Sequence, residues 1–224
     1  MTASKALNEI VRLLTKSGSF LVEVKPSSVN GAGRGVFATE NVPKDSVVCL
    51  YPGIYTPPLP AHASIDDGSH YVGNITAPSG GPISHNAYIL NLQAVGGFLD
   101  GNALVGNDGR VLDRDSISCG HLVNHRSTSG ANVRVLSFRW DSLPTLDASI
   151  IPNDTRCDGA PWYLDGNSGQ MVRFDRSSTN NQRDLLCGAA LYTCRPVRTG
   201  EELYLDYGLK PPYPPWAKDW YDAQ

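Results

Sequence analysis

The chain has few of the cysteines that stabilise folds through disulfide bonds or bound metal ions. Its 224 residues include five cysteines, an odd number, and no two of them form a C-x-x-C pair. This count and spacing argue against a disulfide framework and against a zinc cluster. We therefore expect a reduced intracellular compartment, nuclear or cytoplasmic, and no bound metal.

Long apolar runs and an excess of positive charge are missing as well. No apolar stretch approaches the ~20 residues of a membrane-spanning helix, and the first residues lack the apolar core and cleavage site of a secretory signal. The formal net charge is -3 at pH 7, which leaves no basic field to attract nucleic acid or an anionic membrane. We expect neither partner, whereas a mildly acidic surface would tolerate a basic protein substrate.

A chain of this length can bury one substantial core, so we expect one domain. We also expect a monomer. Apolar residues recur at helical spacing between residues 4 and 17, and Gly18 stands where a helix would stop. This pattern predicts an amphipathic N-terminal helix over residues 1–18 that packs on the domain. Its basic residues would also suit a mitochondrial presequence, but Glu9 counts against that alternative.

Short β-rich segments alternate with turn residues from residue 19 to residue 208. Many short strands and few helical patterns predict a mainly β domain. Between Val135 and Leu136 the apolar phase shifts, which predicts a β-bulge. The segments with strand character are 20–24, 36–38, 46–51, 88–92, 133–140, 170–174, 187–193 and 203–207.

Three further stretches have loop or tail composition. Residues 55–86 and 141–169 are rich in Pro, Gly, Asp and Asn, and we expect both to be surface insertions in the domain. Residues 209–224 combine prolines, which stiffen the chain, with aromatic side chains that offer stacking surface.

Glycines alternate at Gly31, Gly33 and Gly35 near the start of the domain. Such spacing permits positive φ and close approach of the backbone to a ligand, although an ordinary turn would use it as well. Because the chain continues as a strand from Val36, neither a dinucleotide-binding loop nor a phosphate-binding loop fits.

Two more segments hold polar residues of interest. His121-Leu122-Val123-Asn124-His125 lies mid-chain, where a simple polar bend is one interpretation and a zinc site is disfavoured by the missing Glu and third ligand. The later segment, residues 200–208, reads Gly-Glu-Glu-Leu-Tyr-Leu-Asp-Tyr-Gly. There we expect Glu201 and Glu202 at a turn and on the surface, and Tyr207 at a strand end.

Taken in this order, the three segments resemble the signature set of the SET-domain protein lysine methyltransferases. The match extends over Asn30–Gly53 and residues 88–101. The resemblance implies a β-clip type fold of several small sheets, with a pseudoknot-like crossing near the C-terminus. Together with the N-terminal helix expected from the apolar spacing, this gives a mainly β fold with a minor α+β character. It also implies S-adenosylmethionine as cofactor and a methyl group transferred to a lysine of a protein or peptide, histone or non-histone.

The resemblance assigns cofactor contacts to particular residues. The backbone at Gly33, Arg34 and Gly35 would contact the methionine part of the cofactor. Asn124 and His125 would hold its amino group and adenine edge, and Asn132 resembles the last Asn of the same motif. Arg126 departs from the family's serine, and the interval from Asn124 to Asn132 is two residues longer than the motif.

Further residues are assigned to the lysine side and to the tail. Tyr207 resembles the catalytic tyrosine, and Tyr88 would line the lysine channel, unless each is merely a strand aromatic. Leu205 stands where the family usually carries Phe or Tyr, and in the family a tyrosine hydroxyl at this site holds a water where a further methyl group would go. Because leucine cannot anchor that water, we expect products beyond monomethyl-lysine to be sterically possible. Many members carry three zinc-binding cysteines after the domain, but no cysteine follows Cys194. We expect Trp216 or Tyr213 to cover the adenine instead, with packing on the domain edge as the alternative.

Two other functions remain open. Arg126, the lengthened motif and Leu205 are also compatible with a SET-fold protein that binds cofactor or a partner without transferring methyl groups. An unrelated β-rich binding domain would bind no cofactor at all.

Overall fold

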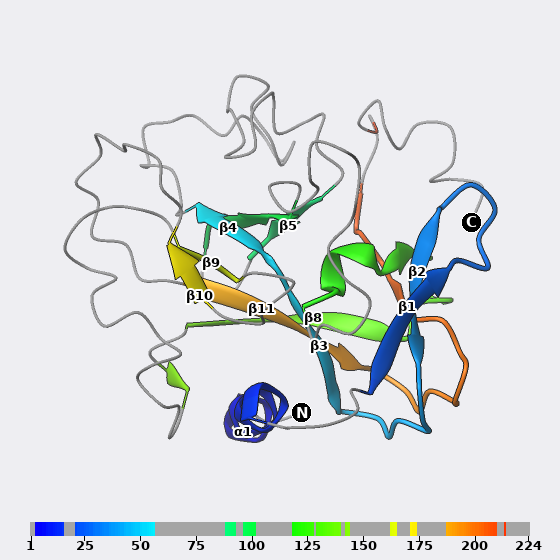
Figure 1. The fold of residues 1–224 in the computed structure, drawn as a ribbon, viewed down its shortest axis with the longest axis horizontal. Helices are drawn as coiled ribbons and strands as arrows, with labels where there is room; N and C mark the ends of the chain where they lie inside the picture. The colour runs from blue at the N-terminus through cyan, green and yellow to red at the C-terminus, as the bar shows by residue number, and fades with distance from the viewer. Residues whose placement is uncertain are drawn as a thin grey trace.

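The computed structural model describes residues 3–15, 21–56, 88–92, 96–101, 118–127, 129–139, 142–143, 162–164, 171–173, 187–209 and 213. Within these residues one α-helix accompanies twelve short strands, which form two five-stranded sheets and a separate hairpin (Figure 1). The described part of the chain holds no helix that is long and apolar enough to cross a membrane.

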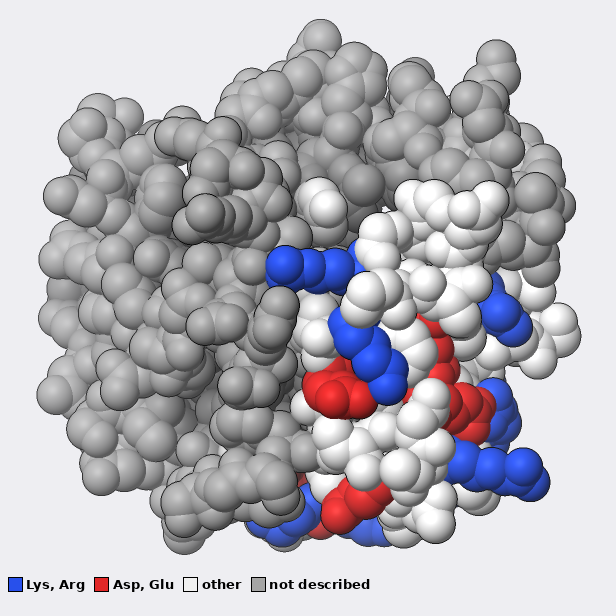
Figure 2. All heavy atoms as spheres, turned by 45° about the vertical axis from the view of Figure 1, so that its right-hand side comes forward, with Lys and Arg blue, Asp and Glu red and all other residues white. Residues whose placement is uncertain are grey.

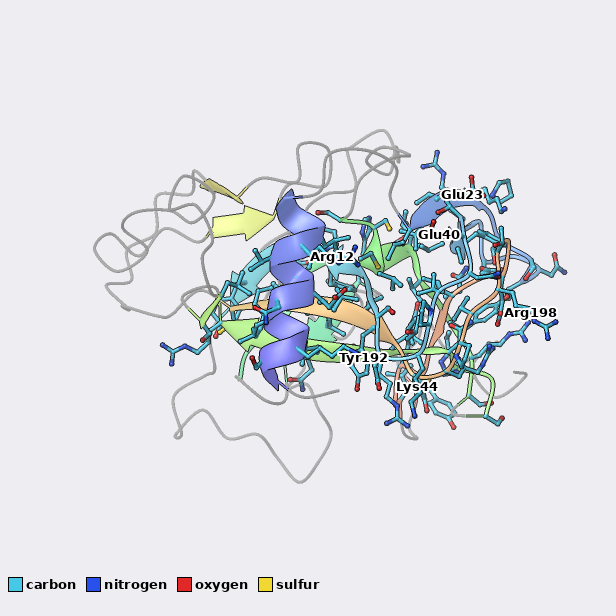
Figure 3. All side chains as sticks on the ribbon, turned by 90° about the horizontal axis from the view of Figure 1, so that it is seen from below. Arg12, Glu23, Glu40, Lys44, Tyr192 and Arg198 are labelled. Carbon is cyan, nitrogen blue, oxygen red and sulfur yellow. The ribbon has the colours of Figure 1, made fainter. Side chains whose placement is uncertain are left out.

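The helix α1 (Ala3–Thr15) confirms the amphipathic pattern. Its apolar side, with Ala6, Ile10 and Leu13 buried, packs against strand β3 (Val47–Tyr51). Figure 3 shows α1 lying across one face of the sheet that contains β3. Burying a residue such as Ile10 contributes about 1.5–3 kcal/mol, so the helix is fixed by tertiary packing rather than by its own propensity.

The central sheet contains the strands that hold the candidate site. The strand order is β3, β11 (Cys187–Thr193), β8 (Val133–Arg139), β12 (Tyr204–Leu205) and β7 (Asn124–His125). The long strands β3 and β8 pair antiparallel with β11, whereas the two-residue strands β12 and β7 pair parallel at the end of the sheet. Leu205 of β12 pairs with His125 of β7 on one side and with Val133 of β8 on the other.

The second five-stranded sheet and the hairpin complete the fold. The hairpin joins β1 (Val22–Pro26) to β2 (Arg34–Ala38) antiparallel. The second sheet has the order β10 (Met171–Arg173), β9 (Trp162–Leu164), β4 (Gly53–Thr56), β6 (Phe98–Asp100) and β5 (Ile89–Asn91). Strand β9 lies inside the stretch 141–169 that was expected to be an insertion, where its Trp-Tyr-Leu sequence pairs with β4 and β10.

Each of the eight segments with predicted strand character contains a strand, but the predicted bulge is wrong. Strand β8 pairs with β11 in unbroken register from Val133↔Thr193 to Arg139↔Cys187. The apolar phase shifts because β8 crosses between two core clusters: Val133 is buried in one, and Phe138 in the other. The register irregularity lies instead in β11, between Leu191 and Tyr192, where it pairs with β3.

Candidate functional site

The alternating glycines lie in and after the turn between β1 and β2, and they are needed for two different reasons. Gly31 and Gly33 have φ of 78° and 71°, the left-handed region that glycine adopts without strain. Gly35 is in β2, where an added Cβ would overlap a carboxylate oxygen of Glu202. The third glycine therefore makes room for a side chain 167 positions further along the chain.

Glu202 is the centre of a dense hydrogen-bond network, and the expectation that it is a surface residue is wrong. Only 4% of it is exposed. Its Oε1 accepts from Ser27 Oγ at 2.6 Å and Asn124 Nδ2 at 3.0 Å. Its Oε2 accepts from the backbone N of Ser28 at 2.8 Å, Ser28 Oγ at 2.6 Å and Tyr204 Oη at 2.8 Å.

The network keeps this carboxyl group ionised. Burial alone would raise the pKa of Glu202, but hydrogen bonds from Ser27, Ser28 and Asn124 outweigh burial and lower the pKa below its ordinary value. Its neighbour Glu201 is half-buried and pairs with Arg195, with Oε1 and Nη2 2.6 Å apart. The two adjacent glutamates thus have different roles, which no local pattern in the sequence distinguishes.

Asn124, in β7, is oriented by three acceptors. Its Nδ2 donates to Ser27 Oγ at 3.0 Å, to the Arg34 carbonyl at 2.9 Å and to Glu202. Its Oδ1 accepts no hydrogen bond from the described residues, so this oxygen remains available to a donor such as an amino group. The amide also ties β7 to the backbone at Arg34, which brings two of the sequence-predicted cofactor segments together.

Asn132 lies completely buried behind this network. Its Nδ2 donates to the Glu202 carbonyl at 2.8 Å, and its Oδ1 accepts from the Tyr204 backbone N at 2.7 Å. The side chain therefore fixes the backbone that leads into β12. We assign Asn132 a structural role, despite its resemblance to the last Asn of the motif.

His125, in β7, contacts Tyr207, which lies two residues after the end of β12. The Tyr207 backbone N donates to His125 Nδ1 at 3.2 Å, and the two rings lie 5.2 Å apart. Because Nδ1 accepts this bond, the imidazole is neutral when the contact is made. Burial lowers the pKa of His125, against the opposing effects of the Asp206 charge and the Leu205 backbone.

The Tyr207 side chain is fixed at its other end as well. Its Oη donates to the Val123 carbonyl at 2.9 Å. Burial, and then the nearby Tyr88 phenol, raise the pKa of Tyr207 well above its ordinary value, so the hydroxyl stays protonated at neutral pH. Tyr88 is held through its carbonyl, which accepts from Tyr51 Oη at 2.7 Å and from the Gly101 backbone N at 3.0 Å.

The burial of His121 beside these tyrosines was not predicted from the sequence. His121 is 6% exposed, with its ring centroid 6.4 Å from that of Tyr51 and 6.2 Å from that of Tyr88. Neither of its ring nitrogens has a hydrogen-bond partner among the residues that the structure describes. Burial lowers its pKa to about 4, so the ring is neutral at physiological pH. The sequence signals only its place three residues before Asn124.

The remaining predicted residues are placed as follows. Leu205 is buried in the core cluster that also contains Val133 and Leu203. Trp216 lies outside the described residues, whereas Tyr213 is described and half-buried. In the part of the chain that the structure describes, no three His, Cys, Asp or Glu side chains gather where they could hold a metal ion. On the described part of the face that Figure 2 presents, basic and acidic side chains are interspersed.

A family model decides the assignment: the SET domain model matches residues 33–208, which include Asn124, His125, Glu202 and Tyr207. The chain belongs to the SET-domain family. The predicted family and fold class are thereby confirmed, and the matched range begins at Gly33 and ends at Gly208. A comparison with curated protein sequences found no match to the chain.

Several solved structures resemble this SET domain. KRYPTONITE in complex with mCHH DNA, H3(1-15) peptide and SAH has a TM-score of 0.43 and 15% identity, covering 89% of this chain and 26% of that one. A candidate histone methyltransferase of Plasmodium falciparum, PFL0690c, has a TM-score of 0.40 and 12% identity, and the match covers 86% of this chain and 97% of that one. The polycomb repressive complex 2 of Chaetomium thermophilum has a TM-score of 0.40 and 13% identity, and the match covers 88% of this chain and 16% of that one. The family assignment rests on the family model alone.

Proposed function

We propose that this SET domain transfers a methyl group from S-adenosylmethionine to a lysine side chain of a protein substrate, histone or non-histone. The observation that carries the proposal is the double anchoring of Tyr207, by His125 at its backbone and by Val123 at its hydroxyl. A buried, protonated phenol that is held at both ends beside a second tyrosine keeps its oxygen in a fixed position. Its hydrogen is donated to the Val123 carbonyl, so its oxygen can accept an N–H of an amine and orient that amine.

The residues around Asn124 fit the proposed cofactor. Asn124 Oδ1 is an unengaged acceptor among the described residues, in an orientation set by three hydrogen bonds from Nδ2. It would hold the amino group, with the backbone of Gly33, Arg34 and Gly35 along the methionine part and His125 at the adenine edge. When bound, the cofactor supplies an electrophilic methyl group on a sulfonium sulfur.

The residues of this chain then have two tasks on the lysine side. The first is to favour the neutral amine, because an ammonium group has no lone pair with which to attack. Burial around Tyr207 and Tyr88 disfavours a charged amine, just as it keeps the Tyr207 phenol protonated. The second task is alignment: Tyr207 Oη and the Val123 carbonyl would set the direction of the amine for an in-line displacement.

Arg126 is accommodated outside this arrangement, which favours transfer over the alternative of a binding-only SET-fold protein. Its guanidinium lies 4.1 Å from the centroid of the Tyr204 ring, and the residue is exposed. Its backbone N still donates to the Leu205 carbonyl at 3.1 Å. The replacement of the family's serine therefore leaves the pairing of β7 with β12 intact.

We further propose that Leu205 permits more than one methyl group per lysine. Its side chain has no hydroxyl to hold a water where a second methyl group would go. Mass spectrometry of an exhaustively methylated peptide should show dimethyl or trimethyl lysine. An end point fixed at one methyl group would overturn this assignment. The tail as a lid over the adenine, through Tyr213 or Trp216, stays a prediction, as do the monomeric state and the nuclear or cytoplasmic location.

The decisive experiment is transfer of labelled methyl groups from S-adenosylmethionine to an array of proteins and peptides. Wild type should label a lysine, and Tyr207→Phe should lower the rate about 100-fold or more. Tyr192→Phe is the matched control, because Tyr192 is a half-buried tyrosine that packs against the α1 side of the core (Figure 3). Equal transfer by wild type and Tyr207→Phe would contradict the proposal.

A further inference from the structure

We infer that Glu202 is a positioning residue for cofactor binding, acting through Asn124 and the turn that follows β1. The inference rests on the proposed function, since it concerns the same cofactor. Glu202 joins three segments that are far apart in sequence: Ser27 and Ser28, Asn124 in β7, and Tyr204 in β12.

The charge on this carboxylate is stabilised by neutral groups. All of its described partners are hydroxyls, an amide or a backbone N–H, and it forms no ion pair with a described residue. Hydrogen bonds to an ionised acceptor are about twice as strong as neutral ones, and losing one inside a buried network leaves its donor unsatisfied. The geometry of the donors therefore depends on Glu202 remaining a carboxylate.

The orientation of Asn124 follows from this arrangement. An Asn side chain offers donors at one end and an acceptor at the other, and here Glu202 Oε1 is one of three acceptors that draw Nδ2 inward. Oδ1 is thereby turned away from the carboxylate. Without that acceptor, the two orientations of the amide become closer in energy, and the acceptor proposed for the cofactor amino group is no longer fixed.

Replacement of Glu202 by glutamine is a sensitive test of the network, because in either orientation the new amide places its NH2 group against a hydrogen-bond donor. If its NH2 group takes the place of Oε1, it faces the Asn124 Nδ2 donor. If it takes the place of Oε2, it faces the Ser28 backbone N–H, a donor that cannot rotate away. The substitution keeps size and shape and removes only the charge and one acceptor.

Isothermal titration with S-adenosylhomocysteine tests the inference, because this ligand binds without reacting. Glu202→Gln should bind it about tenfold or more weakly than wild type. The matched control is Glu201→Gln, which removes the adjacent charge from its pair with Arg195 and should bind within about twofold of wild type. Melting temperatures of the same samples without ligand show that folded protein is compared.

A purely structural role would lower the melting temperature of Glu202→Gln and leave the affinity of the folded protein unchanged; that result would overturn the inference. If Glu202→Gln does not fold, Ser28→Ala removes one hydroxyl donor from Oε2 without touching Asn124, and it should weaken binding about threefold, whereas wild-type affinity would overturn the inference. A wild-type protein that binds neither S-adenosylhomocysteine nor S-adenosylmethionine would refute the proposed function, and the inference with it.

A double-mutant cycle identifies the route of the effect. If Glu202 acts in part through Asn124, the double variant Glu202→Gln/Asn124→Ala should lose less affinity for S-adenosylhomocysteine than the sum of the two single losses, and what remains is the contribution of the turn after β1. Fully additive losses would show that Glu202 does not act through Asn124, and would overturn the inference.

Discussion

Two neighbouring regions of this SET domain differ in the hydrogen bonding and the charge of their buried polar groups. In the carboxylate corner, formed by Ser27, Ser28, Asn124, Glu202 and Tyr204, one ionised group receives five hydrogen bonds and its pKa is lowered. In the tyrosine corner, formed by Tyr51, Tyr88, His121 and Tyr207, both ring nitrogens of His121 are without a hydrogen-bond partner in the described part of the chain, and burial keeps His121 and Tyr207 neutral.

The difference matches the two tasks of the proposed reaction. A cationic, polar cofactor is best received by donors and acceptors whose directions are already fixed, as in the carboxylate corner. A lysine must lose its charge before it can attack, and a poorly hydrated environment that disfavours ions promotes this loss. Preorganisation on one side and low polarity on the other are thus complementary features of one site.

The largest expected effect concerns the pH dependence of the tyrosine corner. The folded pKa of His121, about 4, lies below the ordinary value of 6.5, so the unfolded chain binds the proton more readily. The associated stability is fully present above pH 6.5 and is lost as the pH falls toward 4. This group alone should reduce the free energy of unfolding by about 3 kcal/mol over that range.

Urea unfolding of wild type and His121→Leu at pH 7 and pH 4.5 measures this contribution. Leucine is apolar and of similar size, so the variant should lose less stability over that range than wild type. The other titrating groups are shared by both proteins and cancel in the comparison. Equal losses in the two proteins would show that His121 is hydrated or paired, and would remove the contrast between the corners.

A smaller effect is expected where the hairpin meets the carboxylate corner. In Gly35→Ala the new methyl group would occupy the position of the Glu202 carboxylate, which must move and give up hydrogen bonds. We expect a loss of roughly 2 kcal/mol in unfolding free energy and weaker cofactor binding.

Gly31→Ala is the matched control for this substitution. An added Cβ at Gly31 has no atom within 4 Å, so only the backbone cost of φ 78° remains, about 1 kcal/mol. If Gly35→Ala were no more destabilising than Gly31→Ala, the Glu202 carboxylate would be able to move aside at little cost in stability, contrary to what its hydrogen bonds indicate.

The smallest effect is expected at Arg126, on the outer side of the carboxylate corner. Arg126→Ala removes an exposed cation–π contact with Tyr204, worth about 0.5–1 kcal/mol, and should leave methyl transfer unchanged. Thermal melting and the labelled-transfer assay measure both quantities. A large loss of transfer would mean that Arg126 contacts the substrate or cofactor, so that the corner extends to the surface.

Much of the fold was predictable because its signals are local. The apolar spacing of α1 and the β-rich runs that became β3, β8 and β11 lie within single segments of the chain. Strand β7 was not predicted, because two polar residues, Asn124 and His125, become a strand only by pairing with β12. The same holds for β9, whose partners in β4 and β10 are set by the tertiary structure.

The candidate site divides in the same way. Tyr207, Asn124 and His125 were identified from motifs, and the structure brings all three together with Arg34. The burial of Glu202 depends on Ser27 and Ser28, more than 170 positions away, and that of His121 on Tyr51 and Tyr88. Such burial is a property of the assembled molecule, and no periodicity in the sequence encodes it.

The central claim is that the carboxylate corner governs cofactor binding and the tyrosine corner governs transfer. The most direct measurement is the rate of methyl transfer as a function of S-adenosylmethionine concentration for wild type, Glu202→Gln and Tyr207→Phe. We predict that Glu202→Gln raises KM for the cofactor and approaches the wild-type rate at saturation, while Tyr207→Phe loses kcat with little change in KM. A Tyr207→Phe protein whose rate is restored by excess cofactor, or a Glu202→Gln protein whose rate is not, would contradict the account.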